Sequence, residues 1–202
     1  MKIHDETRVP EFLKMLDELK NTRLEIGIFG EDDGDMVMIG SVHEFGADIT
    51  PKKSRFLTIP LNKKAKEKSP RDFDDLFVLH ADSGELFLVK EKGQDSLEFY
   101  YWLARSVKIP ERSFIRAGFD KNKDNMISKG DDLLEQVIQL KLPVDTFFSV
   151  LGEYLVGQIQ GYLTSLKEPP NSPVTANNKG SSNPLVDTGR LRDSITYKVV
   201  SD

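Results

Sequence analysis

Two short patterns in this chain of 202 residues could carry enzymatic chemistry. The tripeptide Asp-Thr-Gly at 187–189 opens the active-site loop of aspartic proteases, but that chemistry needs two facing aspartates and no second such tripeptide occurs. His43 and Glu44 begin the His-Glu-x-x-His motif of zinc metalloproteases, yet Ala47 occupies the position of the second histidine. The chain has no cysteine, and its three histidines lack the spacing of metal ligands. We therefore expect no enzymatic activity and no zinc site.

A third pattern is similar to the calcium-binding loop of an EF-hand. In segment 120–131, oxygen-bearing side chains stand at positions one, three, five, nine and twelve, and the main candidate ligands are Asp120, Asn122, Asp124 and Asp131. Asn125 replaces the glycine that makes the sharp turn, and the short Asp131 stands where glutamate would bind through both oxygens. The segment before the loop has an extended pattern, so the first EF-hand helix is missing. A calcium-dependent binding module is therefore an alternative function, and we expect no cofactor.

The composition predicts a soluble protein made in the cytoplasm. Charged residues make up 30% of the chain, no apolar run approaches a membrane-spanning length, and the first residues lack the apolar core of a signal peptide. The formal net charge of −5 argues against a general basic surface that grips nucleic acid. It does not exclude a surface past which DNA must slide.

A local basic run stands out against this acidic background. It consists of Lys63, Lys64, Lys66 and Lys68, interrupted by Glu67. Such a run can contact DNA or an acidic partner, but a solvated loop is the interpretation we favour.

The first part of the chain alternates helix and strand patterns. Apolar residues on one face predict a helix from Pro10 to about Leu19, and alternation predicts a strand from Arg23 to Gly30. A solvated acidic turn follows at 31–35. Met36 to Phe45 predicts a short helix that ends at Gly46, which can adopt the left-handed conformation.

The region 61–108 has the pattern of a β-hairpin insertion. The apolar runs 76–79 and 86–89 are separated by a polar turn, which indicates two paired strands. The aromatic cluster 99–103 follows, and without interleaved Lys or Arg it favours packing on the hairpin or a subunit contact over base stacking.

A long helix is predicted from Val144 to about Leu166, with an apolar stripe and few charges elsewhere on its surface. A helix of this kind is expected to be covered on both sides. Gly157 and Gly161 lie one turn apart, and they would let either the helix's own sheet or a neighbouring subunit approach closely. From Lys167 to Ser182 no periodicity remains, so this segment is predicted to be a mobile loop.

These elements predict an α+β fold in a single domain over residues 1–202. An antiparallel β-sheet, formed by the Leu24 strand, the hairpin and the C-terminal strand, would pack against one long α-helix. The fold would thus contain an inserted β-hairpin and a long C-terminal loop. In the last segment, Asp187 or Thr188 is predicted to cap a short helix, which leads into a strand with alternating Ile195, Tyr197 and Val199.

Five motifs, in order, resemble those of the neck or tail-completion proteins of tailed bacteriophages. They are Val-His-Glu-Phe-Gly at 42–46, Ile-Pro-Glu-Arg-Ser-Phe-Ile-Arg at 109–116, Pro-Asn-Ser-Pro at 170–173, Lys-Gly-Ser at 179–181 and Pro-Leu-Val-Asp-Thr-Gly-Arg-Leu-Arg-Asp-Ser-Ile at 184–195. The last block is the most specific. In the resembling proteins the Gly-ended helix runs quickly into the Ile-Pro-x-Arg-x-Phe segment, so the region between 61 and 108 departs from the simplest pattern.

The resemblance implies a structural protein that assembles as a ring of six or twelve copies and joins the DNA-filled head to the tail. Its implied partners are itself, a head-completion or adaptor protein, a tail terminator or tail tube protein, and double-stranded DNA that passes through the ring. A tail terminator is the alternative within the same connector. The implied location is the virion neck, after assembly in the host cytoplasm. The residues expected to serve structure and assembly are Phe45, Gly46, Arg112, Phe114, Gly157, Gly161, Asp187, Thr188, Gly189 and Leu191.

Overall fold

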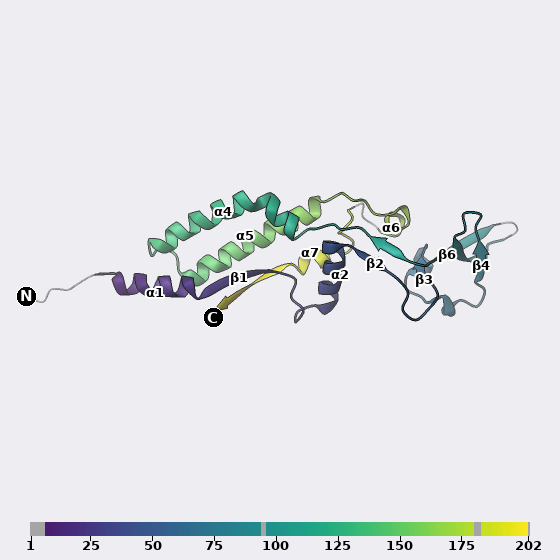
Figure 1. Cartoon of the computed structure of the whole chain (residues 1–202), viewed down its shortest axis with the longest axis horizontal. Coiled ribbons are helices and arrows are strands. Elements are labelled where there is room, and N and C mark those ends of the chain that lie inside the picture. The colour runs from purple at the N-terminus through teal and green to yellow at the C-terminus, as the bar shows by residue number, and fades with distance from the viewer. Residues whose placement is uncertain (1–6, 94–95, 180–182, 202) are drawn as a thin grey trace, which may run out of the picture. The chain divides into compact units, whose positions relative to one another are not determined.

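The computed structural model describes residues 7–93, 96–179 and 183–201, and the chain forms two compact units (Figure 1). Unit 1 comprises the described residues up to 44, 113–166 and those from 188, and unit 2 comprises 45–112 and 167–187. The α+β class is confirmed. The sequence predicts a single domain over 1–202, whereas the chain clusters into these two compact units.

Unit 1 contains two long helices and a two-stranded antiparallel sheet. Its elements are α1 (Val9–Lys20), β1 (Thr22–Gly27), α2 (Gly34–Phe45, whose last residue belongs to unit 2), α4 (Arg116–Ile138), α5 (Val144–Ser165), α7 (Arg190–Asp193) and β8 (Thr196–Ser201). β1 and β8 pair along their whole length, from Thr22 opposite Ser201 to Gly27 opposite Thr196. The predicted helices at 10–19, 36–45 and 144–166 are confirmed to within two residues.

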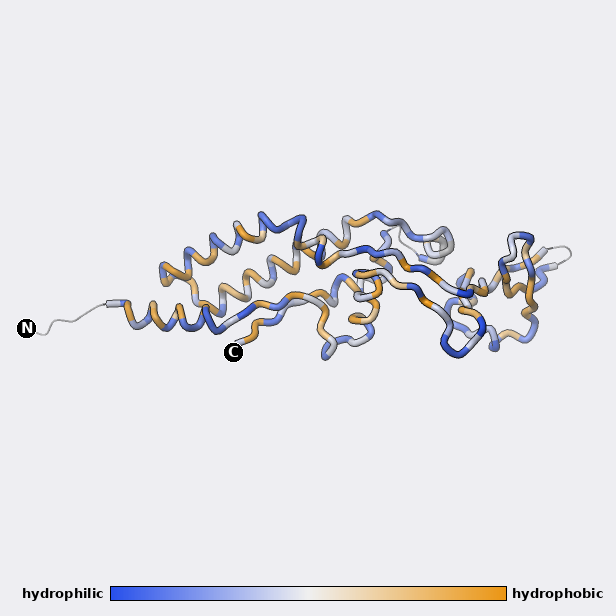
Figure 2. Tube along the Cα trace, viewed as in Figure 1, coloured by the Kyte–Doolittle hydropathy of each residue, from blue (hydrophilic) through white to orange (hydrophobic). Residues whose placement is uncertain are grey.

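Helix α5 is the centre of unit 1, because α4 packs on one side of it and the β1–β8 pair on another. The predicted stripe is buried at Val144, Phe148 and Ile159, but Val156 and Leu163 are buried as well. Hydrophobic residues recur along the length of α5, whereas α4 is more hydrophilic (Figure 2). The few charges on α5 therefore reflect contacts within the subunit.

Helix α4 corrects the EF-hand interpretation. Residues 120–131 lie inside this 23-residue helix, so the backbone does not fold around a central cation as an EF-hand loop does. Asn122 instead donates from its side-chain amide to the carbonyl of Gly118 at 2.8 Å. The helix is anchored by a few apolar residues, including Met126, Leu133 and Val137, and its charged residues face solvent. That sparse apolar pattern is why the sequence did not predict it.

Unit 2 has a sheet of its own, so the prediction of one common sheet is wrong. Its elements are β2 (Ala47–Ile49), β3 (Leu57–Pro60), α3 (Lys63–Lys66), the 3-10 turn η1 (Pro70–Asp72), β4 (Phe77–His80), β5 (Leu86–Glu91), β6 (Leu97–Ala104), β7 (Val107–Ile109) and α6 (Pro173–Asn178). Within the described residues, β3, β6, β5 and β4 pair antiparallel in that order, and β2 pairs with β7. The predicted hairpin is confirmed as β4 and β5.

The aromatic cluster 99–103 builds the core of unit 2. The register between β5 and β6 shifts after Leu88, and the resulting bulge turns both Tyr100 and Tyr101 toward the segment that carries α3 and η1. There they pack with Ala65 and with Phe73, whose ring centroid lies 4.9 Å from that of Tyr100. On the hairpin side, Leu88 packs with these tyrosines and the Phe87 ring lies 5.3 Å from that of Phe99, which confirms packing on the hairpin, one of the two predicted roles of the cluster.

A matched pair of glycines in α5 tests this packing. Gly152→Ala is expected to lower the free energy of unfolding by about 1–3 kcal/mol, because the new Cβ would lie 2.4 Å from the Tyr197 ring on β8. The control is Gly157→Ala, whose Cβ meets nothing within 4 Å and should raise stability by up to about 1 kcal/mol through helix propensity. Urea unfolding followed by circular dichroism measures both. A Gly152→Ala protein as stable as the wild type would contradict the packing of β8 on α5.

Candidate functional site

The carboxylate of Glu44 binds the N-terminus of helix α4 in unit 1. Its Oε2 accepts hydrogen bonds from the backbone N–H groups of Phe114 and Ile115, at 2.7 and 2.9 Å. Its Oε1 accepts from the Ser113 hydroxyl at 2.7 Å, and from the backbone N–H and the guanidinium Nε of Arg116 at 3.1 and 3.0 Å. A residue far away in sequence thus supplies the cap that the first helical N–H groups need.

The surroundings of Glu44 favour its charged form. The side chain is almost fully buried, at 5% exposure, and this burial acts to raise its pKa. Hydrogen bonds from Ile115, Ser113, Arg116 and Phe114 act in the opposite direction, and together they hold the pKa of Glu44 below its ordinary value of 4.5. The positive end of the helix dipole also favours an anion at this position. The carboxylate is therefore a structural anion whose lone pairs are already engaged.

Three distant segments meet beside this cap. A Cβ added to Gly40 would lie 2.8 Å from the side chain of Ile28 and 3.7 Å from those of Phe114 and Leu191. Phe114 has no exposed surface, and Leu191 and Ile195 are buried. Segments from the motifs at 42–46, 109–116 and 184–195 therefore share one packed region of unit 1.

The acidic turn at 31–35 is paired with cations of the C-terminal motif and strand. Asp33 accepts from the Arg190 guanidinium at 3.1 Å, and its other oxygen accepts from the backbone N–H of Met36. Lys198 on β8 pairs with Glu31 and contacts the Asp32 carboxylate. These two cations offset part of the negative charge of the turn, which the sequence predicts to be solvated.

The C-terminal helix is capped differently from the prediction. Gly189 is the residue before α7, and it adopts a left-handed conformation with φ of 88°. Thr188 contributes one long hydrogen bond, in which its Oγ1 accepts from the N–H of Arg190 at 3.5 Å. Asp187 is exposed and caps no helix in the described part of the chain. The prediction of a cap by Asp187 is wrong because the left-handed glycine already turns the chain into the helix.

In unit 2, Gly46 and Arg112 have defined roles. Gly46 has φ of 72°, and a Cβ there would lie 3.0 Å from the backbone N of Glu111, so the predicted left-handed conformation is confirmed. The buried Arg112 donates from Nε to the carbonyl of Pro169 at 2.6 Å and from Nη2 to that of Pro170 at 2.8 Å. Phe45, by contrast, is 63% exposed.

Residues 167–179, the described part of the segment predicted to be a mobile loop, contain a short helix and side-chain contacts. Arg112 holds its first residues, and Pro173–Asn178 forms α6. Lys179 donates to the carbonyl of Pro184 at 2.8 Å. Residues 180–182 of the Lys-Gly-Ser motif and the end of this loop lie outside the described residues.

Gly157 and Gly161 lie on the exposed side of α5. No atom of the described residues lies within 4 Å of a Cβ added to either glycine, so these glycines do not pack on the β1–β8 sheet. They line a shallow hollow of about 250 Å³, together with Lys121, Asn122 and Tyr162. Of the two contacts that the sequence left open, the one with the protein's own sheet is not made.

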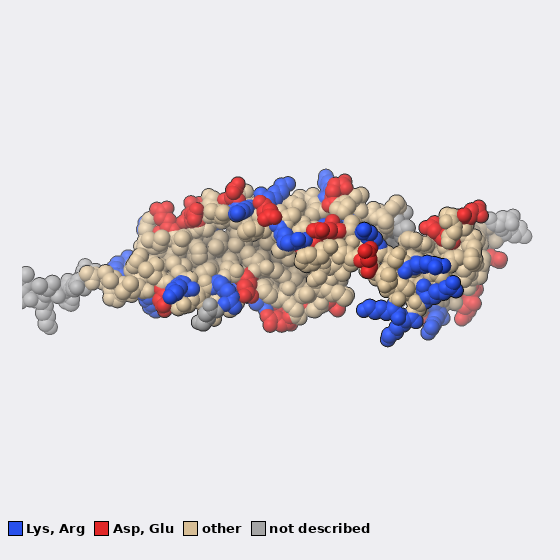
Figure 3. Space-filling view, viewed as in Figure 1, with Lys and Arg blue, Asp and Glu red and all other residues tan. Residues whose placement is uncertain are grey.

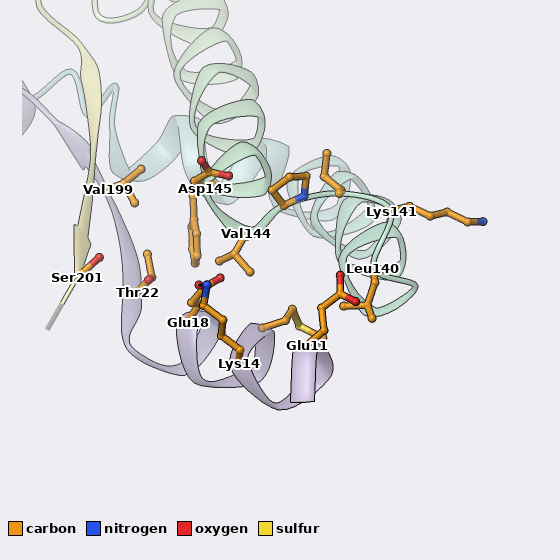
Figure 4. A pocket seen from close by; sticks show the side chains of 14 residues that line it. Glu11, Lys14, Glu18, Thr22, Leu140, Lys141, Val144, Asp145, Val199 and Ser201 are labelled. Atoms are coloured by element: carbon orange, nitrogen blue, oxygen red, sulfur yellow. Dashed lines mark ion pairs between the residues drawn. The ribbon is translucent and has the colours of Figure 1, made fainter. Parts of the chain in front are cut away.

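A larger cavity of about 630 Å³ lies between α1, the turn from α4 to α5, and the ends of β1 and β8 (Figure 4). Its apolar wall includes Met15, Val144 and Phe148, and its charged rim consists of Glu11, Lys14, Glu18, Lys141 and Asp145. All five charged side chains are exposed, and such groups lack the burial that adapts a carboxylate or amine to catalysis.

Across the described ranges, no group of three or more His, Cys, Asp or Glu residues could hold a metal ion. No helix in those ranges is long and apolar enough to span a membrane.

Replacing Glu44 tests its role as the distant cap of α4. Glu44→Gln should lower the free energy of unfolding by about 2–4 kcal/mol, because an amide cannot accept from all the donors that surround the carboxylate. The control Glu18→Gln removes an exposed pairing with Lys14 at 3.4 Å and should cost less than about 0.5 kcal/mol. Urea unfolding measures both, and equal stabilities of the two variants would contradict the cap.

The lowered pKa of Glu44 also predicts a pH dependence. Its contribution to stability is present above the ordinary pKa of 4.5 and is lost as the pH falls through the lower pKa of the folded state. The difference in unfolding free energy between wild type and Glu44→Gln should therefore shrink as the pH is lowered below 4.5. Urea titrations at about pH 7 and at a series of acidic pH values measure this difference. A difference that stays constant until both proteins unfold would show that Glu44 is not held as an anion.

Comparison with known proteins identified no relative of this chain. No family model matches the chain, and neither a curated protein nor a solved structure matches it. The resemblance to phage neck proteins is therefore an expectation from the sequence motifs alone.

Proposed function

We propose that this protein is a structural subunit of the neck of a tailed-bacteriophage virion, where a ring of copies joins the DNA-filled head to the tail. The observation that carries the proposal is the convergence of the motif residues in unit 1. Glu44 caps α4, while Phe114 and Leu191 pack beside it. The residues on which the resemblance rests thus build the framework of the subunit. A carboxylate engaged by five donors is poorly suited to act as a catalytic base.

The proposed ring is a cyclic homo-oligomer, with six or twelve copies by resemblance. Cyclic contacts join two different faces of neighbouring copies, so each subunit needs two complementary surfaces. One candidate is the outer stripe of α1, where Val9, Leu13 and Leu16 follow helical spacing and are exposed by 58, 59 and 42%. The other is the hollow at Gly157 and Gly161, where another backbone can approach closely.

In this proposal, the ring contacts a head-completion or adaptor protein on one side and a tail terminator or tail tube protein on the other. Double-stranded DNA passes through its opening. The protein is located at the head–tail interface of the virion after assembly in the host cytoplasm. Exposed apolar side chains such as Phe45 in unit 2 are suited to contacts with these partner rings.

A phage that lacks the protein tests the proposal directly. Its lysate should contain separate full heads and separate tails that fail to join, because the connecting ring is missing. Adding purified wild-type protein to the lysate should restore infectious, joined particles. Negative-stain electron microscopy and plaque counts measure the two effects, and restored particles should show a cyclic array of copies at the neck.

Point variants in the same complementation assay test the α1 surface. Leu13→Glu places a charge on the exposed apolar stripe and should reduce the rescue by at least about tenfold while the monomer stays folded. The control Lys14→Glu places a glutamate one position away, outside the stripe, and this variant should rescue normally.

Joined particles in the absence of the protein would refute the connector function. Empty or unexpanded heads would point to a role in packaging instead.

A further inference from the structure

Unit 2 carries a dense group of exposed cations on and around α3. Every Lys and Arg between residues 50 and 71 is exposed, and Glu67 is the one acidic residue among them. This group, the basic surface, consists of Lys52, Lys53, Arg55, Lys63, Lys64, Lys66, Lys68 and Arg71. Figure 3 shows Lys and Arg side chains gathered over the part of unit 2 that contains β3. This cluster contrasts with the net charge of −5 of the whole chain.

The fold holds these cations outward. Ala65 is 1% exposed and packs into the core of unit 2, so the lysines on either side of it in α3 face solvent. Asn62 caps this short helix by accepting from the N–H of Ala65 at 2.9 Å, and its amide donates to the carbonyl of Phe99 at 2.8 Å. The lysines of α3 therefore project from an anchored turn, which corrects the prediction of a solvated loop.

Most nearby acidic groups already have partners, and only one of them, Glu98, pairs with a cation of the basic surface. Glu98 pairs with Lys64 at 2.9 Å, and Asp72 accepts from the backbone N–H of Ser69 at 2.7 Å in a capping box. Asp75 pairs with Lys90. Within the described residues, no ion pair engages Lys52, Lys53, Lys63 or Lys66. Their charge is therefore available to another molecule.

The electrostatics of the half-buried Lys179 are consistent with this excess of positive charge. Burial lowers the pKa of its ammonium group, and repulsion from Arg112 and Lys66 lowers it further, while Asp187 opposes the change. Lys66 is thus close enough to act on a second cation of unit 2. Positive charges held together in this way attract a polyanion.

We infer that the basic surface binds the phosphate backbone of duplex DNA, through charge and without reading its sequence. Protein interfaces are depleted in lysine and have an apolar core, whereas the large exposed hydrophobic residues of unit 2, such as Phe77, Val78 and Phe99, lie outside residues 50–71. Single strands require aromatic rings that are free to stack, but Phe73 and Tyr100 pack in the core. Flexible lysines on a polar surface match the regularly spaced charges of a duplex. The inference deepens the proposed function and rests on it for the source of the DNA.

Fluorescence anisotropy with a labelled duplex of random sequence tests the inference on the full chain. The wild type should bind at low salt, and its affinity should fall steeply as salt rises. The triple variant Lys53→Gln, Lys63→Gln and Lys66→Gln should bind at least about tenfold more weakly and reduce the salt slope by roughly 2–3, because about 0.9 counterions are released per phosphate contact. All three side chains are exposed, so the melting temperature should not change.

The matched control removes three positive charges from unit 1 instead. It carries Lys20→Gln, Lys123→Gln and Lys141→Gln, all at exposed positions. It should bind DNA like the wild type. Equal losses in both triple variants would show that only net charge matters, and no binding by the wild type at low salt would also overturn the inference. Displacement by polyglutamate as efficient as by unlabelled duplex would assign the surface to an acidic protein instead.

These outcomes are separate from the test of the connector function. Phage particles that join without the protein refute the connector but leave the anisotropy result standing. Absence of DNA binding refutes the basic surface as a DNA site and leaves the connector intact.

Discussion

The interaction on which unit 1 depends most is the capture of the α4 N-terminus by the carboxylate of Glu44. Burial of an ion is costly unless its hydrogen bonds are complete, and here the backbone and side-chain donors of residues 113–116 complete them. The same contact supplies N–H groups at the start of α4 with an acceptor, so both partners would be destabilised without the other. It positions α4, which in turn covers one side of α5. A single charged residue thereby links α2 to the long helices of unit 1.

The fold also divides the charges of the chain into those that are paired and those that are free. The acidic turn at 31–35 lies against Arg190 and Lys198, which come from the opposite end of the chain. The acidic residues nearest to the basic surface form a helix cap or individual ion pairs. An acidic protein can in this way present a local positive surface, because long-range attraction depends on where the charges lie as well as on their sum.

Local patterns in the sequence predicted those elements whose apolar residues repeat regularly. The period of α5 and the two alternating runs of β4 and β5 were sufficient to place both features, and Gly46 marked the end of α2. Helix α4 escaped prediction because its few apolar anchors are widely spaced among charged residues, and its side-chain oxygens have the spacing of a calcium loop. The sequence predicted one common sheet and not the separate sheets of the structure, because strand pairing is decided by contacts between segments far apart in the chain.

For the candidate site, the sequence by itself indicated the segments 42–46, 109–116 and 184–195, but it did not single out Glu44 among the residues expected to serve structure and assembly. It also determined that Gly46 needs a left-handed backbone, because that preference is a property of the residue. Only the tertiary structure decided what the motifs do: that Glu44 binds residues 113–116, that Arg112 holds the carbonyls of Pro169 and Pro170, and that Gly189 rather than Asp187 starts α7. The physical reason is that a hydrogen bond between distant residues has no signature in local spacing, because its geometry exists only after the intervening chain has folded.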